Sequence, residues 1–242
     1  MLHQDRLYSK SLKVIEQFQF DDSVAAVFED MVTRSVPGYL LLLDLLGVVA
    51  EKMIKPNSLC YDLGCSLGAS TLSIRHNIQT KACKIIAIDN SKAMTNRCEQ
   101  IINNDKTAVP VCVLNQNVLD YSFEPCQFVA MNLLLMFIAK NQRTKLIKSI
   151  YDQLNPGGVL FISEKIAFTD NHENKLINDL HHQFKIHQGY SQLEVAQKRE
   201  AIEHVLIPET FEEHKNRLNQ VGFKSTYMLF QSFNFISFIA IK

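Results

Sequence analysis

Short apolar runs alternate with longer segments of helical spacing along much of the chain. Five runs have the length and composition of strands, at residues 59–63, 84–88, 111–114, 128–131 and 159–163. Segments with helical spacing lie between them, at residues 71–78, 91–102 and 142–154. Strands that alternate with helices form βαβ units, in which helices cover both faces of a parallel sheet. The pattern therefore predicts an α/β fold.

Further helices are expected on both sides of this alternation. Asp21 or Asp22 is suited to cap a helix that runs through Arg34, and an apolar helix follows the Pro37-Gly38 break, at residues 39–52. Residues 171–204 are polar and helical without a strand signal, and we interpret them as an insertion or lid. Thr210 is expected to cap a last helix, which ends at residue 221.

Two strands close the chain, at residues 227–231 and 233–241, as a hairpin-type ending. We predict a single domain over residues 1–242, with an N-terminal helical extension (about 1–55) and a helical insertion (about 170–206). Its sheet is expected to be Rossmann-like, seven-stranded and mostly parallel, with an antiparallel last strand and helices on both faces.

Composition and charge narrow the class of function. The 25 Lys and Arg residues balance 25 Asp and Glu residues, whereas nucleic-acid binders usually carry a basic excess. We therefore expect a small-molecule substrate and no direct contact with nucleic acid. The six cysteines form no C-x-x-C pair and follow no secretory segment, which favours reduced thiols in the cytoplasm. The most apolar stretch, residues 40–50, is interrupted by Asp44 and is too short to cross a membrane.

A glycine-rich turn between the first strand and its helix is the most informative feature. Gly64 allows a tight turn after the strand, and Gly68 lets a ligand approach the start of the helix. Asp62 at the strand end is positioned to face the same crevice, and Asp89 ends the next strand. A carboxylate at Asp89 would accept hydrogen bonds from both ribose hydroxyls of a bound nucleoside. The fingerprint G-x-G-x-x-G is absent, so a ligand without a pyrophosphate, such as S-adenosylmethionine, is favoured over a nicotinamide cofactor.

The same turn also fits a hydrolase. Residues 64–68 match G-x-S-x-G, the nucleophile elbow, with Ser66 as nucleophile and Asp170 and His204 as partners later in the chain. An upstream oxyanion loop of the H-G-G-G type is missing, and Asp89 has no role in such an enzyme. Nucleoside binding therefore remains the favoured interpretation.

Three segments resemble the class I methyltransferase fold: residues 61–68 (YDLGCSLG), 88–91 (IDNS) and 154–158 (LNPGG). Further segments make the chain resemble, over nearly its whole length, the carboxy-S-adenosyl-L-methionine synthases of wobble-uridine tRNA modification. These segments are residues 24–28, 34–39, 163–165, 181–185, 189–191, 197–199 and 231–235. The resemblance implies a transferase that combines S-adenosylmethionine with prephenate, giving carboxy-S-adenosylmethionine and phenylpyruvate, without a metal.

The resemblance also implies roles for individual residues. Tyr39 and Arg199 are the implied catalytic residues, Tyr39 near the sulfonium and Arg199 pairing with the transferred carboxylate across a homodimer. The implied contacts to the adenosyl ligand are Tyr39, Gly64, Cys65, Ser66, Asp89, Asn90, Asn117, Val118, Asn132 and Arg199. The product would serve a separate tRNA-modifying transferase. From the sequence alone, other roles fit these residues as well. Tyr39 could pack in the core, Asn132 could simply form a turn at the end of a strand, and Arg199 could be a solvated surface residue.

Two departures from the family pattern concern the ligand pocket. Asn117 stands where the family usually has aspartate, so the contact to the adenine amino group loses a charge. Residues 133–136 (LLLM) are apolar where the family tends to be polar, on the prephenate side. The histidines have no metal-ligand spacing, and packing or surface roles are favoured for His181 and His182.

Two other functions stay open at this point. One is a conventional S-adenosylmethionine-dependent methyltransferase that acts on a small molecule or RNA. The other is a non-catalytic subunit that binds S-adenosylmethionine and scaffolds a partner. A methyl acceptor requires no cation beside the transferred group, so Arg199 distinguishes the synthase from the methyltransferase.

Overall fold

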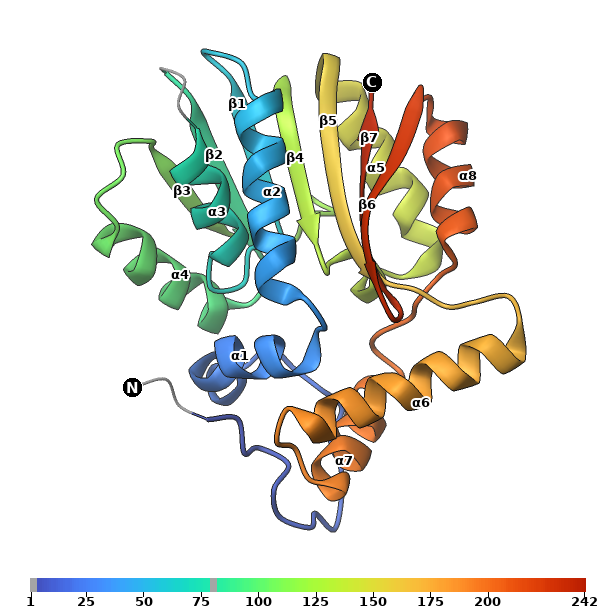
Figure 1. Ribbon diagram of the computed structural model, residues 1–242. Coiled ribbons are helices and arrows are strands. Elements are labelled where there is room, and N and C mark those ends of the chain that lie inside the picture. The colour runs from blue at the N-terminus through green and yellow to red at the C-terminus, as the bar shows by residue number, and fades with distance from the viewer. Residues whose placement is uncertain (1–3, 79–81) are drawn as a thin grey trace.

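The computed structural model describes residues 4–78 and 82–242 (Figure 1). Its strands are β1 (Leu59–Leu63), β2 (Lys84–Asp89), β3 (Val111–Asn115), β4 (Cys126–Asn132), β5 (Leu154–Lys165), β6 (Ser225–Ser232) and β7 (Phe235–Ile241). Its α-helices are α1 (Asp22–Ser35), α2 (Tyr39–Met53), α3 (Ala69–Asn77), α4 (Lys92–Asn104), α5 (Lys140–Gln153), α6 (Asn171–His187), α7 (Gln192–Ile202) and α8 (Phe211–Val221). A short 3₁₀ turn, η1 (Leu135–Phe137), follows β4.

The described strands form one sheet in the order β3-β2-β1-β4-β5-β7-β6. The pairs among β1 to β5 are parallel, and β7 runs antiparallel to both β5 and β6. The Rossmann-like, mostly parallel sheet with one antiparallel strand at the end of the chain is thereby confirmed. Because β1 lies between β2 and β4, the strand order reverses there, and the carboxyl ends of these strands flank the crevice where such folds bind ligands.

Two apolar layers hold the helices to the sheet, since alternate strand residues point to opposite faces. Phe128 and Ala130 of β4 pack with residues of α2 and α3 on one face. Val129 and Met131 of the same strand pack with residues of α5 and α8 on the other. The near-continuous apolar runs of the central strands follow from this double burial.

Two predicted helix starts are confirmed by their caps. Asp21, rather than Asp22, caps α1, and its side chain accepts a hydrogen bond from the Val24 nitrogen at 2.9 Å. Thr210 caps α8 in a reciprocal arrangement with Glu213. Each of these side chains satisfies a backbone N–H group that the first turn of a helix leaves without a partner.

Strand β5 is longer than expected at both ends. It begins at Leu154, directly after α5, whereas the sequence predicted a strand from residue 159. The reason lies at the far end of the chain, where Gly157 and Gly158 exchange backbone hydrogen bonds with Lys242, at 3.0 and 3.1 Å. At its other end β5 continues to Lys165, which pairs with Phe235 of β7.

Helices α1, α6 and α7 lie together beyond the carboxyl ends of the parallel strands, away from the layers that cover the sheet (Figure 1). The segment 171–204 is helical, as expected, and forms α6 and α7. No single helix in residues 4–78 and 82–242 is long and apolar enough to cross a membrane, although the bent pair α1 and α2 meets that test together by length and composition.

Candidate functional site

The turn after β1 is held in a conformation that few residues adopt. Gly64 and Gly68 have φ values of 72° and 89°, and Ser66 between them has a φ of 47°. A Cβ atom at Gly64 would lie 2.9 Å from the Leu134 side chain, so that position needs glycine. A non-glycine residue in the left-handed region is strained, and such strain is concentrated at ligand sites. The backbone nitrogens of Gly64 and Cys65 both donate to the Ile88 carbonyl, at 2.8 and 3.0 Å, which fixes the turn to β2.

Asp62 connects the end of β1 to α3, the helix that follows the turn. Its carboxylate is fully buried, and Oδ2 accepts a hydrogen bond from the Thr71 hydroxyl at 2.6 Å. Burial raises the pKa of Asp62 to about 7, although the Thr71 hydrogen bond opposes the shift. Asp62 does not line the cavity described below, so its predicted orientation toward the ligand crevice is not confirmed, and its Oδ1 has no partner among the described residues.

Asp89 connects the end of β2 to the glycine-rich turn. Its Oδ2 accepts from the Ser66 nitrogen and its Oδ1 from the Ser91 nitrogen, both at 2.9 Å. Burial raises the pKa of this carboxyl above its ordinary value, while the two backbone donors favour its charged form. Asn90 beside it is exposed.

Asn117 and Val118 follow the next strand, β3. Asn117 is exposed, and its Oδ1 accepts a hydrogen bond from the Leu119 nitrogen at 3.0 Å, while Val118 is buried. The parallel pairing of β2 with β3 brings this turn to the same sheet edge as Asp89. Asn90, Asn117 and Val118 therefore lie at the same edge of the sheet as the glycine-rich turn. They do not line the cavity described in the next paragraph.

A cavity of about 320 Å³ opens at the carboxyl ends of β1 and β4. This volume falls within the usual range for small-molecule sites. Five of the sequence-predicted residues line it: Tyr39, Gly64, Cys65, Ser66 and Asn132. Much of the remaining wall is apolar and includes Phe20, Phe28 and Phe235. The fold thus brings the start of α2 and the end of β4 to the glycine-rich turn.

Tyr39 and Asn132 present polar groups to this cavity. Tyr39 is 8% exposed, and its hydroxyl makes no hydrogen bond within the described part of the chain. Burial raises the pKa of Tyr39, which keeps the phenol neutral. Asn132 donates from Nδ2 to the Ser70 hydroxyl at 2.9 Å, whereas its buried Oδ1 has no partner among the described residues. A buried acceptor without a partner is costly, and a ligand donor would satisfy it.

Three lysines and a histidine line another part of the cavity wall, and sequence reasoning missed all four. They are Lys165 at the end of β5, His181 and Lys185 on α6, and Lys198 on α7. His181 is 2% exposed and lies at 2.8 Å from the Ser35 carbonyl through Nε2, which must donate because a carbonyl only accepts. The packing role favoured for His181 is confirmed, because the residue is buried and its ring packs against Phe235, and the residue also lines the cavity. The only signal was that all four fall in segments that carried the family resemblance.

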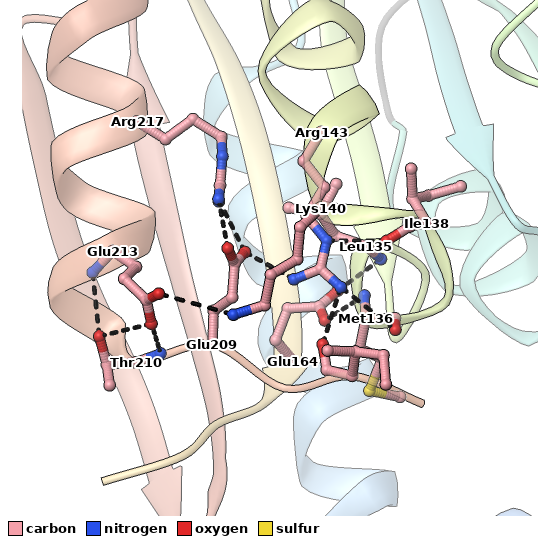
Figure 2. A network of polar contacts seen from close by, with 11 residues as sticks. Leu135, Met136, Ile138, Lys140, Arg143, Glu164, Glu209, Thr210, Glu213 and Arg217 are labelled. Atoms are coloured by element: carbon pink, nitrogen blue, oxygen red, sulfur yellow. Dashed lines mark hydrogen bonds and ion pairs between the residues drawn. The ribbon is translucent and has the colours of Figure 1, made fainter. Parts of the chain in front are cut away.

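The loop after β4 forms an apolar part of the wall through Leu133, Met136 and Phe137. Glu164 holds this loop in place, as Figure 2 shows. Its fully buried carboxylate accepts from the backbone nitrogens of Leu135 and Met136, at 2.7 and 2.8 Å. Burial raises the pKa of Glu164 to about 8, whereas the two backbone donors and the Arg143 charge favour its ionised form.

An ion-pair network beside Glu164 fastens the loop to the segment before α8 (Figure 2). Arg143 is fully buried and contacts Glu209 at 2.6 Å, and Arg217 contacts the same carboxylate at 2.7 Å. Arg143 also donates to the carbonyls of Ile138 and Ile207, at 2.8 and 2.7 Å. The network thus joins α5, α8 and both connecting loops at the edge of the cavity.

Arg199 does not line the cavity of its own chain. It is exposed on α7 and borders a separate surface groove together with His182, Gln183 and Gln192. Its neighbour in sequence, Lys198, lines the cavity instead. Any contact of Arg199 with a ligand at the glycine-rich turn would therefore have to come from another copy of the chain.

The hydrolase alternative is wrong. Its two candidate partners for Ser66 do not line the cavity. Asp170 caps α6 and accepts from the Glu173 nitrogen at 2.7 Å, and the His204 side chain is 83% exposed beside Glu203. Since His204 does not approach Ser66, the turn lacks the base that was proposed for a nucleophile elbow.

Comparison with known proteins places this geometry in a family. Residues 61–158 match the family profile described as a methyltransferase domain. The chain is 46% identical to the carboxy-S-adenosyl-L-methionine synthase of Aliivibrio fischeri (strain ATCC 700601 / ES114), over 242 residues that cover all of both chains. It is 44% identical to the enzyme of the same name from Yersinia pestis (strain Pestoides F), covering 98% of this chain and 89% of that protein.

Solved structures support the fold. A putative S-adenosyl-L-methionine-dependent methyltransferase from Methanococcus maripaludis superposes with a TM-score of 0.61 at 18% identity, covering 93% of this chain and 94% of that one. Human N-acetylserotonin methyltransferase, in complex with SAM, superposes with a TM-score of 0.63 at 14% identity, covering 91% of this chain and 55% of that one. The full-length identity is decisive: the chain belongs to the carboxy-S-adenosyl-L-methionine synthase family, transferases built on the class I methyltransferase fold.

Proposed function

We propose that this enzyme converts S-adenosyl-L-methionine and prephenate into carboxy-S-adenosyl-L-methionine and phenylpyruvate. The observation that carries the proposal is the make-up of one cavity, which combines the glycine-rich turn with three lysines. A methyl acceptor needs no cations beside the transferred group, whereas a carboxylated substrate does. The family to which the chain belongs supports the carboxylated product.

The reaction balances without an added oxidant or reductant. Loss of carbon dioxide and hydroxide from prephenate leaves the aromatic ring of phenylpyruvate. The sulfonium acidifies its methyl group, and the departing hydroxide takes one methyl proton and becomes water. The resulting carbanion then forms a carbon–carbon bond with carbon dioxide. The protein's contribution is to hold both reactants close and to exclude water, which the burial of Tyr39 and His181 at the cavity supports.

We assign the ends of the adenosyl ligand to the predicted residues. Gly64, Cys65 and Ser66 would bind its amino-acid part, and Asp89 and Asn90 its ribose and adenine. The adenine would extend toward Asn117 and Val118 at the neighbouring strand end. Tyr39 and the unpartnered Oδ1 of Asn132 would face the sulfonium end.

We further propose that the enzyme acts as a homodimer, in which Arg199 reaches the cavity of the neighbouring subunit. Its exposure on α7, outside its own cavity, supports this assignment. A planar guanidinium is suited to a bidentate contact with the transferred carboxylate. The product would be consumed by a separate tRNA-modifying transferase in the cytoplasm, and no direct contact with nucleic acid is proposed.

Mass spectrometry of small molecules tests the proposal. Purified protein is extracted before and after incubation with S-adenosylmethionine and prephenate. A species with the mass of S-adenosylmethionine plus carbon dioxide, which increases with prephenate, is the expected result. Formation of S-adenosylhomocysteine instead would assign a conventional methyltransferase. Bound S-adenosylmethionine without any turnover would assign a scaffold.

A further inference from the structure

Three lysines approach one another at the cavity from three different elements. Lys165 ends β5, Lys185 lies on the last turn of α6, and Lys198 lies on α7. The charges of Lys165 and Lys198 both act on Lys185, so each of these two ammonium groups lies close enough to Lys185 to repel it. Like charges at close range destabilise a folded protein unless something neutralises them.

Most of this charge is uncompensated within residues 4–78 and 82–242. Lys198 has a carboxylate partner, Asp5 at 3.5 Å, and donates to the Ser35 hydroxyl at 3.2 Å. Lys165 and Lys185 make no ion pair or hydrogen bond to any described residue. Among the described residues that line the cavity, the acidic one is Glu29, which is exposed on α1. Its charge raises the pKa of Tyr39, and it forms no ion pair with Lys165 or Lys185.

Burial in the cavity wall disfavours the charged forms of the three lysines. Burial lowers the pKa of Lys165 to about 8 and that of Lys185 to about 7, and in Lys185 the two neighbouring lysines add to the effect. Burial also lowers the pKa of Lys198 to about 8, although Asp5 opposes the shift. An anion in the cavity would reverse these shifts by stabilising the ammonium forms.

The same cavity wall holds an unpartnered hydrogen-bond acceptor. His181 is 2% exposed, and its Nδ1 has no partner among the described residues. Its Nε2 donates to the Ser35 carbonyl, and burial with the nearby lysines lowers the pKa of His181 to about 2, so the ring is neutral and Nδ1 accepts. A ligand hydroxyl would satisfy this atom.

We infer that Lys165, Lys185 and Lys198 form the subsite for the second substrate, a small dicarboxylate with an apolar ring. The hydroxyl of this substrate donates a hydrogen bond to Nδ1 of His181. Two uncompensated ammonium groups match two carboxylates, and the rings of Phe20, Phe28 and Phe235 in the same wall match an apolar body. This assignment rests on the proposed function and names the residues that would bind prephenate. The adenosyl ligand is held by the glycine-rich turn and needs none of these lysines.

The test compares the two substrates in lysine variants. Product formation is measured by mass spectrometry while prephenate is varied at saturating S-adenosylmethionine, for wild type, Lys165→Met, Lys185→Met and Lys185→Arg. Methionine keeps the length of the side chain without the charge, so these variants are expected to fold. Lys175→Met is the matched control, because Lys175 is exposed on the same helix, α6.

We expect each methionine variant to raise KM for prephenate by about tenfold or more, because each substitution removes one charge-assisted hydrogen bond to that substrate. Lys185→Arg keeps the charge and should recover most of the affinity. The Kd for S-adenosylmethionine, from calorimetry, should change by less than about twofold. An unchanged KM in both methionine variants would overturn the inference. So would an equal rise in the Kd for S-adenosylmethionine, since the lysines would then bind that ligand's own carboxylate.

Failure of the proposed function has a separate signature. If wild type and Lys175→Met form no carboxylated product, the proposed reaction is wrong. Calorimetric titration of prephenate into wild type and Lys185→Met then decides the subsite by itself. Weaker binding to Lys185→Met supports the subsite, and equal binding rejects it.

Discussion

The carboxylate of Asp89 lies 2.9 Å from the backbone nitrogen of Ser66, so the end of β2 and the glycine-rich turn after β1 form one structural unit. Ser66 is held at a φ of 47° within this unit. A change at Asp89 therefore affects both the ribose contact assigned to it and the shape of the turn.

We predict that Asp89→Ala weakens binding of S-adenosylmethionine by about tenfold to a hundredfold, because both the ribose acceptor and the Ser66 contact are lost. Isothermal titration calorimetry measures the effect. Asp152→Ala serves as control, because Asp152 is exposed on α5 and does not line the cavity. Unchanged affinity in Asp89→Ala would refute the ribose assignment.

Asn117 allows a prediction in the opposite direction. Asn117→Asp keeps an oxygen for the Leu119 nitrogen, which lies at 3.0 Å from Oδ1, and adds a charge at the position assigned to the adenine amino group. Charged acceptors bond more strongly than neutral ones, so the Kd for S-adenosylmethionine should fall by about threefold to tenfold. The same calorimetric titration checks it. A Kd that stays constant or rises would remove Asn117 from the adenine contact.

Arg199 is tested by mixing two variants at an S-adenosylmethionine concentration near the wild-type Kd. Arg199→Ala should lose the carboxylated product but keep S-adenosylmethionine binding, and Asp89→Ala, which binds this ligand about tenfold to a hundredfold more weakly, should form little product at that concentration. In a mixed dimer, the cavity of the Arg199→Ala chain receives an intact Arg199 from its partner. Random exchange of subunits in an equimolar mixture should therefore restore about a quarter of the wild-type activity per site. An inactive mixture, with exchange verified by native mass spectrometry, would show that Arg199 does not act across subunits.

Lys185 is predicted to destabilise the fold that carries it. Its pKa of about 7 in the folded protein lies below the ordinary value of 10.5, so the unfolded chain binds more protons between these pH values. Stability of the wild type should rise with pH across this window, and Lys185→Met should melt at a higher temperature than wild type at pH 7. The difference in Tm should narrow as the pH rises toward 10. A lower Tm for Lys185→Met at pH 7 would show that the ammonium group stabilises the fold.

Glu164 gives a prediction about the wall of the cavity. Glu164→Ala leaves the buried nitrogens of Leu135 and Met136 without an acceptor, which should cost about 2–4 kcal/mol in the free energy of unfolding. Glu164→Gln retains one carbonyl oxygen and should lose less. Urea denaturation provides the measurement, with exposed Glu99→Ala on α4 as control. Equal stability of wild type and Glu164→Ala would mean that the loop after β4 is held by the Arg143 network alone.

Sequence periodicity determined the architecture of this protein, because each element depends on local pattern. Apolar runs such as that of β4 are buried on both faces only in a parallel sheet with helices on each side, and Thr210 caps its helix through residues close to it in the chain. The glycine-rich turn was equally predictable, since Gly64 adopts a conformation that few other residues tolerate. The resemblance to the family rested mainly on other local segments, such as residues 34–39, 181–185 and 197–199.

Only the tertiary structure decided which polar side chains share the cavity. Lys165, Lys185 and Lys198 are widely separated in sequence, and no spacing predicts that β5, α6 and α7 bring them together. The neighbours Lys198 and Arg199 illustrate the limit, since one lines the cavity and the other faces the surface. Successive residues of a helix point about 100° apart, so the packing of α7 decides which of them meets a ligand.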